Sequence, residues 1–315
     1  MPDIDFSPGG TRSTSELRED AESRWYQAEI TVSPALFLKF QHLIYNETGI
    51  WLSESKTALL CGRLARRLRA LEFKSLREYY ELVVRSDQHE ERVRMIDAIT
   101  TNETRFFREP KHFDYLIGTL FPLWRKLAGQ GLRSKRIRVW SAGCSSGEEP
   151  YSLAMVLAEN FPPSEGWDTR ILATDISTRV LAIGQEGVYR ITGAADIPRD
   201  MLQTFMLKGH SEHEGKMKVV RAIREMVEFR RLNLGDEVYP VKETFDAIFC
   251  RNVLIYFDAS SKTRVVDNLV RHLAPQGLLF IGHAENLHSI TEGLKSVAPT
   301  VYLQSKEKHS LREQR

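Results

Sequence analysis

The sequence predicts an α/β protein in which a doubly wound parallel sheet follows a small helical domain. From about residue 137 onward, short apolar runs alternate with segments of helical periodicity, as expected for strands joined by crossover helices. Before this, residues 33–97 place apolar side chains at every third or fourth position. Between 188 and 225 the alternation stops, and short β-like pieces at 217–220 and Ile223 accompany a glycine-containing turn. This stretch indicates a small inserted β-subdomain.

The composition limits the class of protein. The chain has 315 residues, of which 42% are hydrophobic and 27% charged, so it can build a core, and neither global disorder nor a fibrous repeat is expected. No apolar run approaches the roughly 18 residues that span a bilayer, and the amino terminus is acidic, so we expect a cytoplasmic protein. The cysteines, Cys61, Cys144 and Cys250, lie far apart without metal-binding spacing. We therefore expect free thiols and no zinc or other metal.

Charge is distributed unevenly, although the formal net charge is only +2. Residues 1–29 hold seven acidic side chains and three arginines, so 1–30 is predicted to be a disordered acidic tail. The helical domain is placed at 31–98 and the α/β domain at 99–315. The second predicted helix of the helical domain has leucines on one side and, largely on the other, four arginines: Arg63, Arg66, Arg67 and Arg69. Such a helix has either a solvated basic face or a surface for an acidic partner.

Periodicity and helix-breaking residues then assign the elements in order. Ser33-Pro34 is a cap followed by a proline at the first helical position, and 46–49 is a break between helices. One helix is expected over 111–127, followed by a polar linker at 128–136. Strands are predicted at 137–140, 171–173, 227–229, 245–249 and 278–281, with an edge strand at 300–303, and helices at 149–160, 178–185 and 261–273.

The loop after the first strand is a candidate ligand site, because open α/β sheets bind ligands beyond the carboxyl ends of their strands. Its sequence, SAGCSSGEEP at 141–150, is explained either by strand-to-helix geometry or by a ligand. Glu148 and Glu149 would repel a phosphate at this helix start, and there is no Walker lysine. A ligand with a ribose and a positive charge fits better, and S-adenosylmethionine is such a ligand. The alternative role of the two glutamates is stabilisation of the helix dipole.

Polar residues also follow the later strands. Asp175 ends the second strand, where nucleotide-binding sheets bind ribose hydroxyls, although it is also a candidate helix cap. Asn233 follows the third strand and is a candidate for reading the adenine edge. Arg251 and Asn252 follow a buried strand, where the methyl group would be presented. The polar and aromatic segment 100–110 is either a simple domain junction or a loop that closes the site.

Five motifs together resemble the chemotaxis receptor methyltransferases of the CheR type: TNETRFFRE, VWSAGCSSGEEPYSLA, ATDIS, FDAIFCRNVLIYFD and GLLFIGHAEN, within residues 31–306. Enzymes of this family transfer a methyl group from S-adenosylmethionine to glutamate side chains of chemoreceptor signalling domains. The resemblance implies a Rossmann-like S-adenosylmethionine-dependent methyltransferase sheet, an amino-terminal helical domain and a small inserted β-subdomain. It also implies cofactor contacts from Asn102, Thr104, Arg108, Glu148, Asp175, Asn233, Leu234, Arg251 and Asn252.

The resemblance further implies roles in the reaction and in partner binding. Arg108 and Tyr256 match the residues that the family places beside the transferred methyl group. The basic helix of the first domain faces the methylation helix of the receptor, which favours an acidic partner for its four arginines. Some relatives also bind the carboxy-terminal peptide of a receptor at the β-subdomain, which for this chain stays an open alternative. An acceptor glutamate is already ionised at neutral pH, so no catalytic histidine is expected.

Two rival functions use the same ligand. A nucleic-acid amino-methyltransferase would carry an Asn-Pro-Pro-Tyr turn, but the segment NVLIY at 252–256 lacks both prolines, so we expect no nucleic-acid partner. A module that senses S-adenosylmethionine or S-adenosylhomocysteine without turnover would not need Arg108 and Tyr256. We expect neither rival, and no direct insertion into a membrane.

Overall fold

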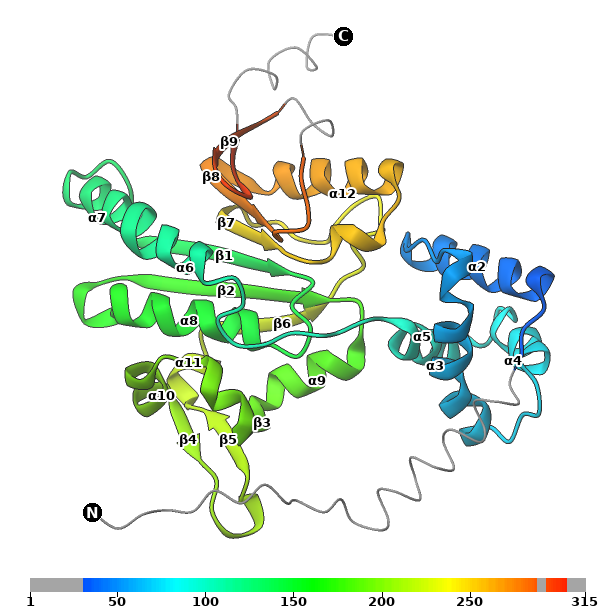
Figure 1. Cartoon of the computed structure of the whole chain (residues 1–315). Coiled ribbons are helices and arrows are strands. Elements are labelled where there is room, and N and C mark those ends of the chain that lie inside the picture. Colours follow the sequence, from blue (N-terminus) through cyan, green and yellow to red (C-terminus); the bar gives the residue numbers. More distant parts are fainter. Residues whose placement is uncertain (1–30, 288–292, 305–315) are drawn as a thin grey trace, which may run out of the picture. The chain divides into compact units, whose positions relative to one another are not determined.

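The computed structural model describes residues 31–287 and 293–304, so the acidic tail predicted for 1–30 lies outside the described residues. The chain divides into two compact units (Figure 1). Among the described residues, one unit contains 31–43 and 53–99, and the other contains 44–52, 100–287 and 293–304. In the described part of the chain, no helix has both the length and the apolar character needed to cross a membrane.

The first unit is helical because its apolar side chains recur at helical spacing. Leu60, Leu64 and Leu68 form one buried stripe, as the sequence predicted. Ser75 begins a further helix, and its hydroxyl accepts a hydrogen bond from the backbone N–H of Glu78. The helices with residues in this unit are α2 (Pro34–Thr48), η1 (Glu54–Lys56), α3 (Thr57–Ala70), α4 (Leu76–Val83) and α5 (His89–Ile99), and α2 continues into the second unit.

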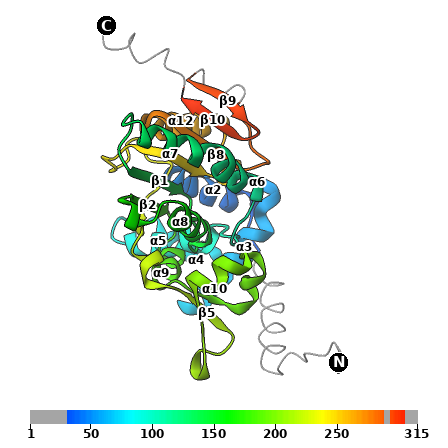
Figure 2. The ribbon, with the colours of Figure 1, turned by 90° about the vertical axis from the view of Figure 1, so that its left-hand side faces the viewer.

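The second unit is built on a sheet of seven strands among the described residues, in the order β6-β2-β1-β7-β8-β10-β9. Strands β6, β2, β1, β7 and β8 run parallel, which confirms the predicted fold class. Strands β10 and β9 pair antiparallel at one edge, drawn in red in Figure 2. The bounds are β1 (Arg136–Ala142), β2 (Asp168–Asp175), β6 (Val227–Arg231), β7 (Phe245–Cys250), β8 (Leu273–Ile281), β9 (Leu294–Ala298) and β10 (Val301–Gln304).

Helices cover both faces of this sheet because successive strand residues point to opposite sides. Val139 and Phe249 pack into one core with residues of α6, α7 and α8, whereas Trp140 and Ile248 pack into a second core with α12. Figure 1 shows α8 and α12 on opposite sides of the parallel strands. The helices are α6 (Pro110–Tyr115), η2 (Leu116–Leu120), α7 (Phe121–Gly129), α8 (Glu148–Asn160), η3 (Pro163–Glu165), α9 (Thr178–Glu186), η6 (Leu254–Tyr256) and α12 (Ala259–Arg271).

The single helix predicted over 111–127 is interrupted. Residues Leu116–Leu120 form a π-helical turn between α6 and α7. Pro122 lies in the first turn of α7 and has no N–H to donate to the carbonyl of Gly118, so the regular ladder of bonds is broken here. The periodicity of the apolar residues continues through this defect, which is why the sequence pattern did not reveal it.

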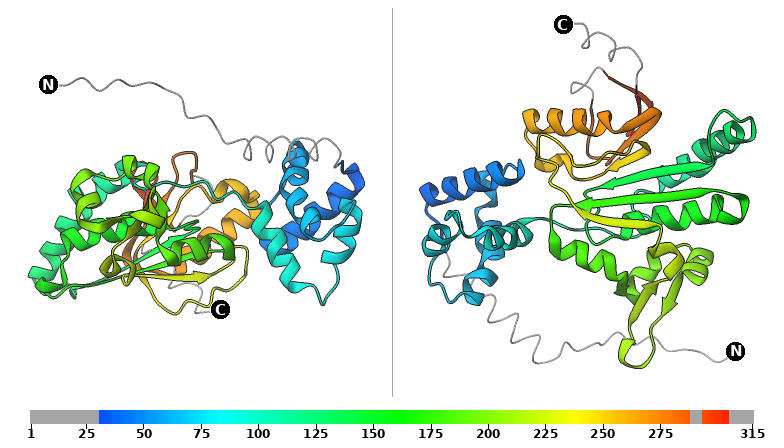
Figure 3. Two further views of the ribbon diagram at one scale, coloured as in Figure 1. Left: turned by 90° about the horizontal axis from the view of Figure 1, so that it is seen from below. Right: turned by 180° about the vertical axis from the view of Figure 1, so that it is seen from behind.

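The insertion between α9 and β6 forms a separate three-stranded antiparallel sheet in the order β3-β5-β4 (Figure 3). Strand β5 confirms the predicted β-like piece at 217–220. The prediction at Ile223 was wrong, because this buried residue belongs to a short helix and a single apolar residue does not define a strand. The elements are β3 (Val188–Arg190), η4 (Ile191–Asp196), α10 (Arg199–Phe205), β4 (Met206–Lys208), η5 (Ser211–His213), β5 (Lys216–Val219) and α11 (Arg221–Arg224).

Candidate functional site

The loop between β1 and α8 is fixed against the ends of its neighbouring strands. The backbone N–H groups of Gly143 and Cys144 both donate to the carbonyl of Thr174, at 2.8 and 2.9 Å. Gly143 has a φ of +82°, and a Cβ atom at this position would lie 2.4 Å from Cγ2 of Val253. Glycine is therefore required for the loop after β1 to approach the turn after β7 this closely.

Asp175 organises the same loop from the end of β2. Its Oδ2 accepts a hydrogen bond from the N–H of Ser145, and its Oδ1 accepts one from the N–H of Ser177, both at 2.9 Å. Ser177, rather than Asp175, is the N-cap residue of α9. Asp175 is buried and holds the loop through these two bonds, and a contact from its carboxylate to ribose hydroxyls stays a prediction.

The segment 100–109 runs alongside the loop after β1. The hydroxyl of Ser145 donates to the carbonyl of Asn102 at 2.8 Å, and the N–H of Phe107 donates to the hydroxyl of Ser152 at 3.0 Å. Within the segment, Arg108 donates to the carbonyl of Glu103 at 3.0 Å. These contacts place Asn102 and Phe107 beside the loop and α8, as a loop that closes the site requires, and cofactor contacts by Asn102, Thr104 and Arg108 stay predictions.

A buried guanidinium joins three parts of the site. Nε of Arg251 lies 3.3 Å from Oε2 of Glu109, and one terminal nitrogen lies 3.3 Å from Oε2 of Glu149. The other terminal nitrogen donates to the carbonyl of Arg108. The hydroxyl of Ser141 donates to Oε1 of Glu149 at 2.6 Å. Glu149 is thus a partner of Arg251, beyond the dipole or ligand roles that the sequence offered.

The pKa values of the two acids differ because their surroundings differ. Burial raises the pKa of Glu149, and the nearby Arg251 only partly opposes this. Burial acts on Glu109 in the same direction, but Arg251 and the N–H of His283 outweigh it, and the pKa of Glu109 is lowered. Glu109 is therefore the firmly ionised partner of Arg251.

Glu285 holds the turn that follows β7. Its carboxylate accepts hydrogen bonds from the N–H groups of Asn252 (3.0 Å), Gly282 (2.6 Å) and Ile255 (3.2 Å). Asn252 has a φ of +60°, which this clamp maintains. No role was predicted for Glu285 or Glu109. Each is an acidic residue inside a recognised motif, Glu285 in GHAEN and Glu109 in TNETRFFRE, and has no evident partner nearby in the sequence, which could have marked it as a candidate site residue.

The polar groups of the site fit S-adenosylmethionine. Oδ1 of Asn252 is buried and has no hydrogen-bond partner, so it is an acceptor that the ammonium group of this ligand would satisfy. Glu148 begins α8, and its Oε2 accepts a hydrogen bond from the hydroxyl of Ser146 at 2.7 Å. Burial raises the pKa of Glu148, and a nearby cation would favour its ionised form.

The other predicted residues lie after β6 and β7. Both N–H groups of the Asn233 amide are engaged, with the carbonyl of Glu47 at 2.9 Å and Oδ1 of Asp236 at 2.7 Å. An adenine contact by Asn233 stays a prediction, and Oδ1 is the atom with a further lone pair for it. Leu234 is buried in the core beside α12, and Tyr256 is half-buried at the end of η6. The four predicted receptor-binding arginines belong to α3 of the helical unit.

Comparison with known families decides the identity of this arrangement. The model described as the CheR methyltransferase SAM binding domain matches residues 102–303, and that of the CheR methyltransferase all-alpha domain matches residues 35–100. The chain belongs to the CheR methyltransferase family. Its cofactor is S-adenosylmethionine, and its activity is methylation in chemotaxis that depends on this cofactor.

Curated relatives of this CheR chain are similar over nearly their whole length. Chemotaxis protein methyltransferase 2 of Pseudomonas aeruginosa is 40% identical over 270 residues, which cover 84% of this chain and 91% of the relative. The chemotaxis protein methyltransferase of Borreliella burgdorferi is 38% identical, with 82% and 90% covered. That of Salmonella typhimurium is 38% identical, with 89% and 93% covered.

Asp175→Ala is expected to weaken the binding of S-adenosylmethionine strongly. If the carboxylate accepts the ribose hydroxyls, each lost hydrogen bond to this charged group costs about 1.5–3 kcal/mol, or roughly ten- to a hundredfold in affinity. Calorimetric titration of the CheR chain with S-adenosylmethionine measures this. Asp200→Ala, which removes an exposed carboxylate from α10, is the control and should bind normally. Unchanged affinity in Asp175→Ala would remove Asp175 from the ligand contacts.

Proposed function

We propose that this CheR chain transfers the methyl group of S-adenosylmethionine to glutamate side chains of the cytoplasmic helices of chemoreceptors, giving methyl esters for sensory adaptation. The observation that carries the proposal is that both CheR domain models match, in order, over almost the whole described chain. The proposed partner is the cytoplasmic domain of a chemoreceptor, with the basic side of α3 facing its acidic methylation helix.

The chemistry needs positioning more than proton transfer. A carboxylate oxygen of the acceptor attacks the sulfonium methyl in line, the carbon–sulfur bond breaks, and its electron pair stays on sulfur, which gives an ester and S-adenosylhomocysteine. A glutamate with an ordinary pKa near 4.3 is ionised at neutral pH, so no general base is required. Because opposite charges neutralise each other along the reaction, exclusion of water and alignment should supply most of the rate enhancement.

The residues of the site divide this task. Asp175 is proposed to hold the ribose, Asn233 and Leu234 the adenine, and the loops carrying Arg251 and Asn252 the methionyl part. Glu148, Asn102 and Thr104 complete the cofactor contacts. Arg108 is proposed to hold the carboxylate of the acceptor or of the cofactor, and the hydroxyl of Tyr256 is proposed to position the acceptor oxygen near the methyl group.

Arg108→Ala is expected to abolish transfer, and Tyr256→Phe is expected to lower kcat while leaving the affinity for S-adenosylmethionine unchanged. The tyrosine variant removes one hydroxyl that acts on the acceptor, so the loss should appear in the chemical step rather than in cofactor binding. Single-turnover kinetics with a receptor domain, together with calorimetric binding, separate the two effects. Full kcat in Tyr256→Phe would remove the tyrosine from the mechanism.

The proposed function itself is tested by transfer of labelled methyl to the cytoplasmic domain of a chemoreceptor from the same organism. Label that is released by alkali as methanol, and that disappears when the receptor glutamates are changed to alanine, is the expected result. Label that persists in alkali would indicate methylation of nitrogen instead. Normal cofactor binding without labelling of any receptor would favour the rival sensing module.

A further inference from the structure

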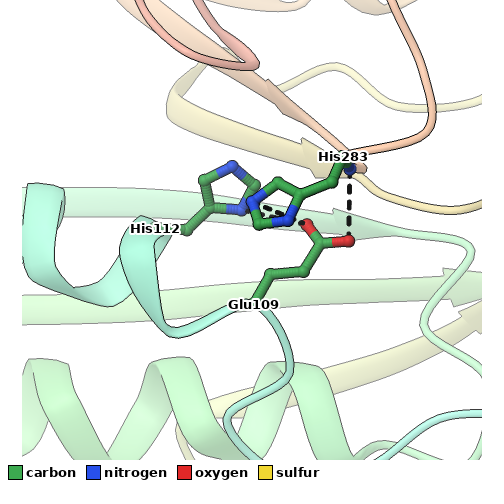
Figure 4. Close-up of side chains that lie close together, drawn as sticks. All are labelled: Glu109, His112 and His283. Carbon is green, nitrogen blue, oxygen red and sulfur yellow. Dashed lines mark hydrogen bonds and ion pairs between the residues drawn. The ribbon is translucent and has the colours of Figure 1, made fainter.

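We propose that Glu109, His112 and His283 form a binding site for a divalent transition metal ion such as Zn²⁺, directly beside Arg251. Figure 4 shows the three side chains pointing toward one another at the start of α6 and the end of β8. The site goes beyond the methyltransferase reaction, which needs no metal, and its expected action is inhibitory.

The geometry of the three ligand atoms is close to that of a metal site. Nδ1 of His112 lies 3.5 Å from Oε2 of Glu109, and Nε2 of His283 lies 4.0 Å from the same oxygen. One ligand atom from each residue can be chosen so that all three lie within 4.8 Å of one another. Tetrahedral zinc with bonds of about 2.0–2.1 Å separates its ligands by roughly 3.4 Å. The side chain of His283 is 48% exposed, so it can move inward to complete the site.

Nδ1 of His112 faces this position and is open to a ligand. On the other side of the ring, Nε2 lies 2.8 Å from the hydroxyl oxygen of Thr300, which is also 2.7 Å from the carbonyl of Pro299. This arrangement suits the tautomer in which Nε2 donates to Thr300 and that hydroxyl donates to Pro299, and in this tautomer Nδ1 offers a lone pair to a metal ion. Nδ1 is buried without a hydrogen-bond partner, and the side chain is only 2% exposed.

Nδ1 of His112 and Oε2 of Glu109 face each other at 3.5 Å, and Nδ1 makes no hydrogen bond. If Nδ1 binds a metal ion, Nε2 is the ring nitrogen that carries the proton, and the hydroxyl oxygen of Thr300 lies in place to accept it. A cation bound between Nδ1 and Oε2 would be coordinated by both.

The supporting contacts that orient metal ligands are also present. The hydroxyl oxygen of Thr300 lies in place to accept the Nε2–H of His112, as outer partners do for ligating histidines. The other oxygen of Glu109, Oε1, accepts hydrogen bonds from the N–H of His283 at 3.2 Å and from Nδ2 of Asn252 at 3.4 Å. Two of the three ligands are therefore held in place before any ion arrives.

Arg251 links this site to the methyltransferase site. A metal ion would lie near the guanidinium, which is unfavourable, and the ionised carboxylate of Glu109, which both cations would contact, offsets part of this repulsion. The metal and Nε of Arg251 would compete for Oε2 of Glu109. Metal binding should therefore displace Arg251 and weaken the binding of S-adenosylmethionine.

The prediction of no metal rested on the absence of short cysteine and histidine spacings in the sequence. His112 and His283 are far apart in the chain and meet only because α6 packs beside the end of β8. The pattern of Glu109 and His112, three residues apart at a helix start, carried no metal signal by itself.

The test is titration of the untagged full chain with Zn²⁺ alone, followed by calorimetry, and with Co²⁺, followed by its visible absorption. We expect about one bound ion per chain with a Kd of about 1 µM or below, and the absorption of tetrahedral Co²⁺. His283→Ala, at a half-exposed position, should raise the Kd at least about tenfold. His213→Ala, which removes an exposed histidine from the β-subdomain, is the matched control and should bind as the unchanged chain does.

A second measurement tests the link to the cofactor. Zn²⁺ should weaken the binding of S-adenosylmethionine to the unchanged chain but not to His283→Ala, and circular dichroism melting checks that both variants are folded. No zinc binding, or equal binding in His283→Ala, would overturn the site. Cofactor affinity that zinc does not alter would overturn the inhibitory action. Neither experiment uses methyl transfer, so failure here is distinguishable from failure of the proposed function.

Discussion

Arg251→Met is expected to lower the free energy of unfolding of the second unit by about 3–5 kcal/mol, because removing one partner of a buried ion pair leaves an uncompensated charge. The side chain of Arg251 is 2% exposed, and its partners Glu109 and Glu149 are 10% and 13% exposed. Methionine has a similar length but no positive charge and no donors. The variant should also lose affinity for S-adenosylmethionine, since the turn after β7 and the segment around Arg108 are no longer tied together.

Urea unfolding of the full chain, with and without S-adenosylmethionine, measures both effects. Arg199→Met replaces an exposed arginine at the start of α10 and is the matched control, expected to change stability by less than about 0.5 kcal/mol. Arg251→Lys should fall between the two, because lysine keeps the charge but not the fork of donors. An unfolding midpoint for Arg251→Met equal to that of the control would contradict the role given to this ion-pair network.

The parallel sheet could be predicted because its strands carry continuous apolar runs, a local property of the sequence. The edge strand β9 (Leu294–Ala298) was not predicted, because the middle residues of LKSVA are exposed and the segment has no apolar run. Its pairing with β10 is a tertiary choice that no local pattern records. The π-helical turn at Leu116–Leu120 escaped because the apolar spacing hides it.

The proximity of the loops was predictable, because it depends on topology alone. Asp175 ends β2 and Asn252 follows β7 in one parallel sheet, so their loops must meet at one edge. The roles of Glu109 and Glu285 were not predictable, because each holds backbone or side chains that become neighbours only through packing. Arg251 and Glu109 are 142 positions apart in the chain, and no spacing rule connects them.

In the helical unit, the roles of the α3 arginines likewise depend on packing and could not be predicted from spacing in the sequence. The sequence placed the four largely on one side of the helix, with the leucines on the other. In the structure, Arg67 forms two hydrogen bonds to Glu91, at 2.8 and 2.6 Å, and Arg63 donates to the carbonyl of Ile99. Arg66 and Arg69 are exposed. Arg63 and Arg67 therefore support the helical unit, whereas Arg66 presents its charge to solvent.

Arg67→Ala should consequently behave as a stability variant, and Arg66→Glu as a receptor-binding variant. The side chain of Glu91 is 5% exposed and also accepts the hydroxyl of Tyr79 at 2.9 Å, so Arg67→Ala removes the closer of its two cationic partners. Arg94, 3.5 Å from Oε2, remains, and the loss should therefore cost less than a fully broken buried pair, about 2–3 kcal/mol. Burial and the charge of Glu91 raise the pKa of Tyr79, so this hydroxyl stays protonated and cannot replace the lost cation.

Arg66→Glu reverses an exposed charge and should leave the unfolding free energy within about 0.5 kcal/mol of the unchanged chain. Because exposed charges act mainly on association, Arg66→Glu should lower kcat/KM for methylation of the receptor. This loss should become smaller as the salt concentration is raised, because salt screens exposed charges. Lys126→Glu makes the same charge change at an exposed position of α7 and is the control.

If Arg67→Ala is as stable as the unchanged chain but methylates receptor slowly, Arg67 contacts the receptor and its pairing with Glu91 is incidental. If Arg66→Glu and Lys126→Glu methylate receptor equally fast at low salt, the basic side of α3 is a solvated surface, and the receptor must be recognised elsewhere.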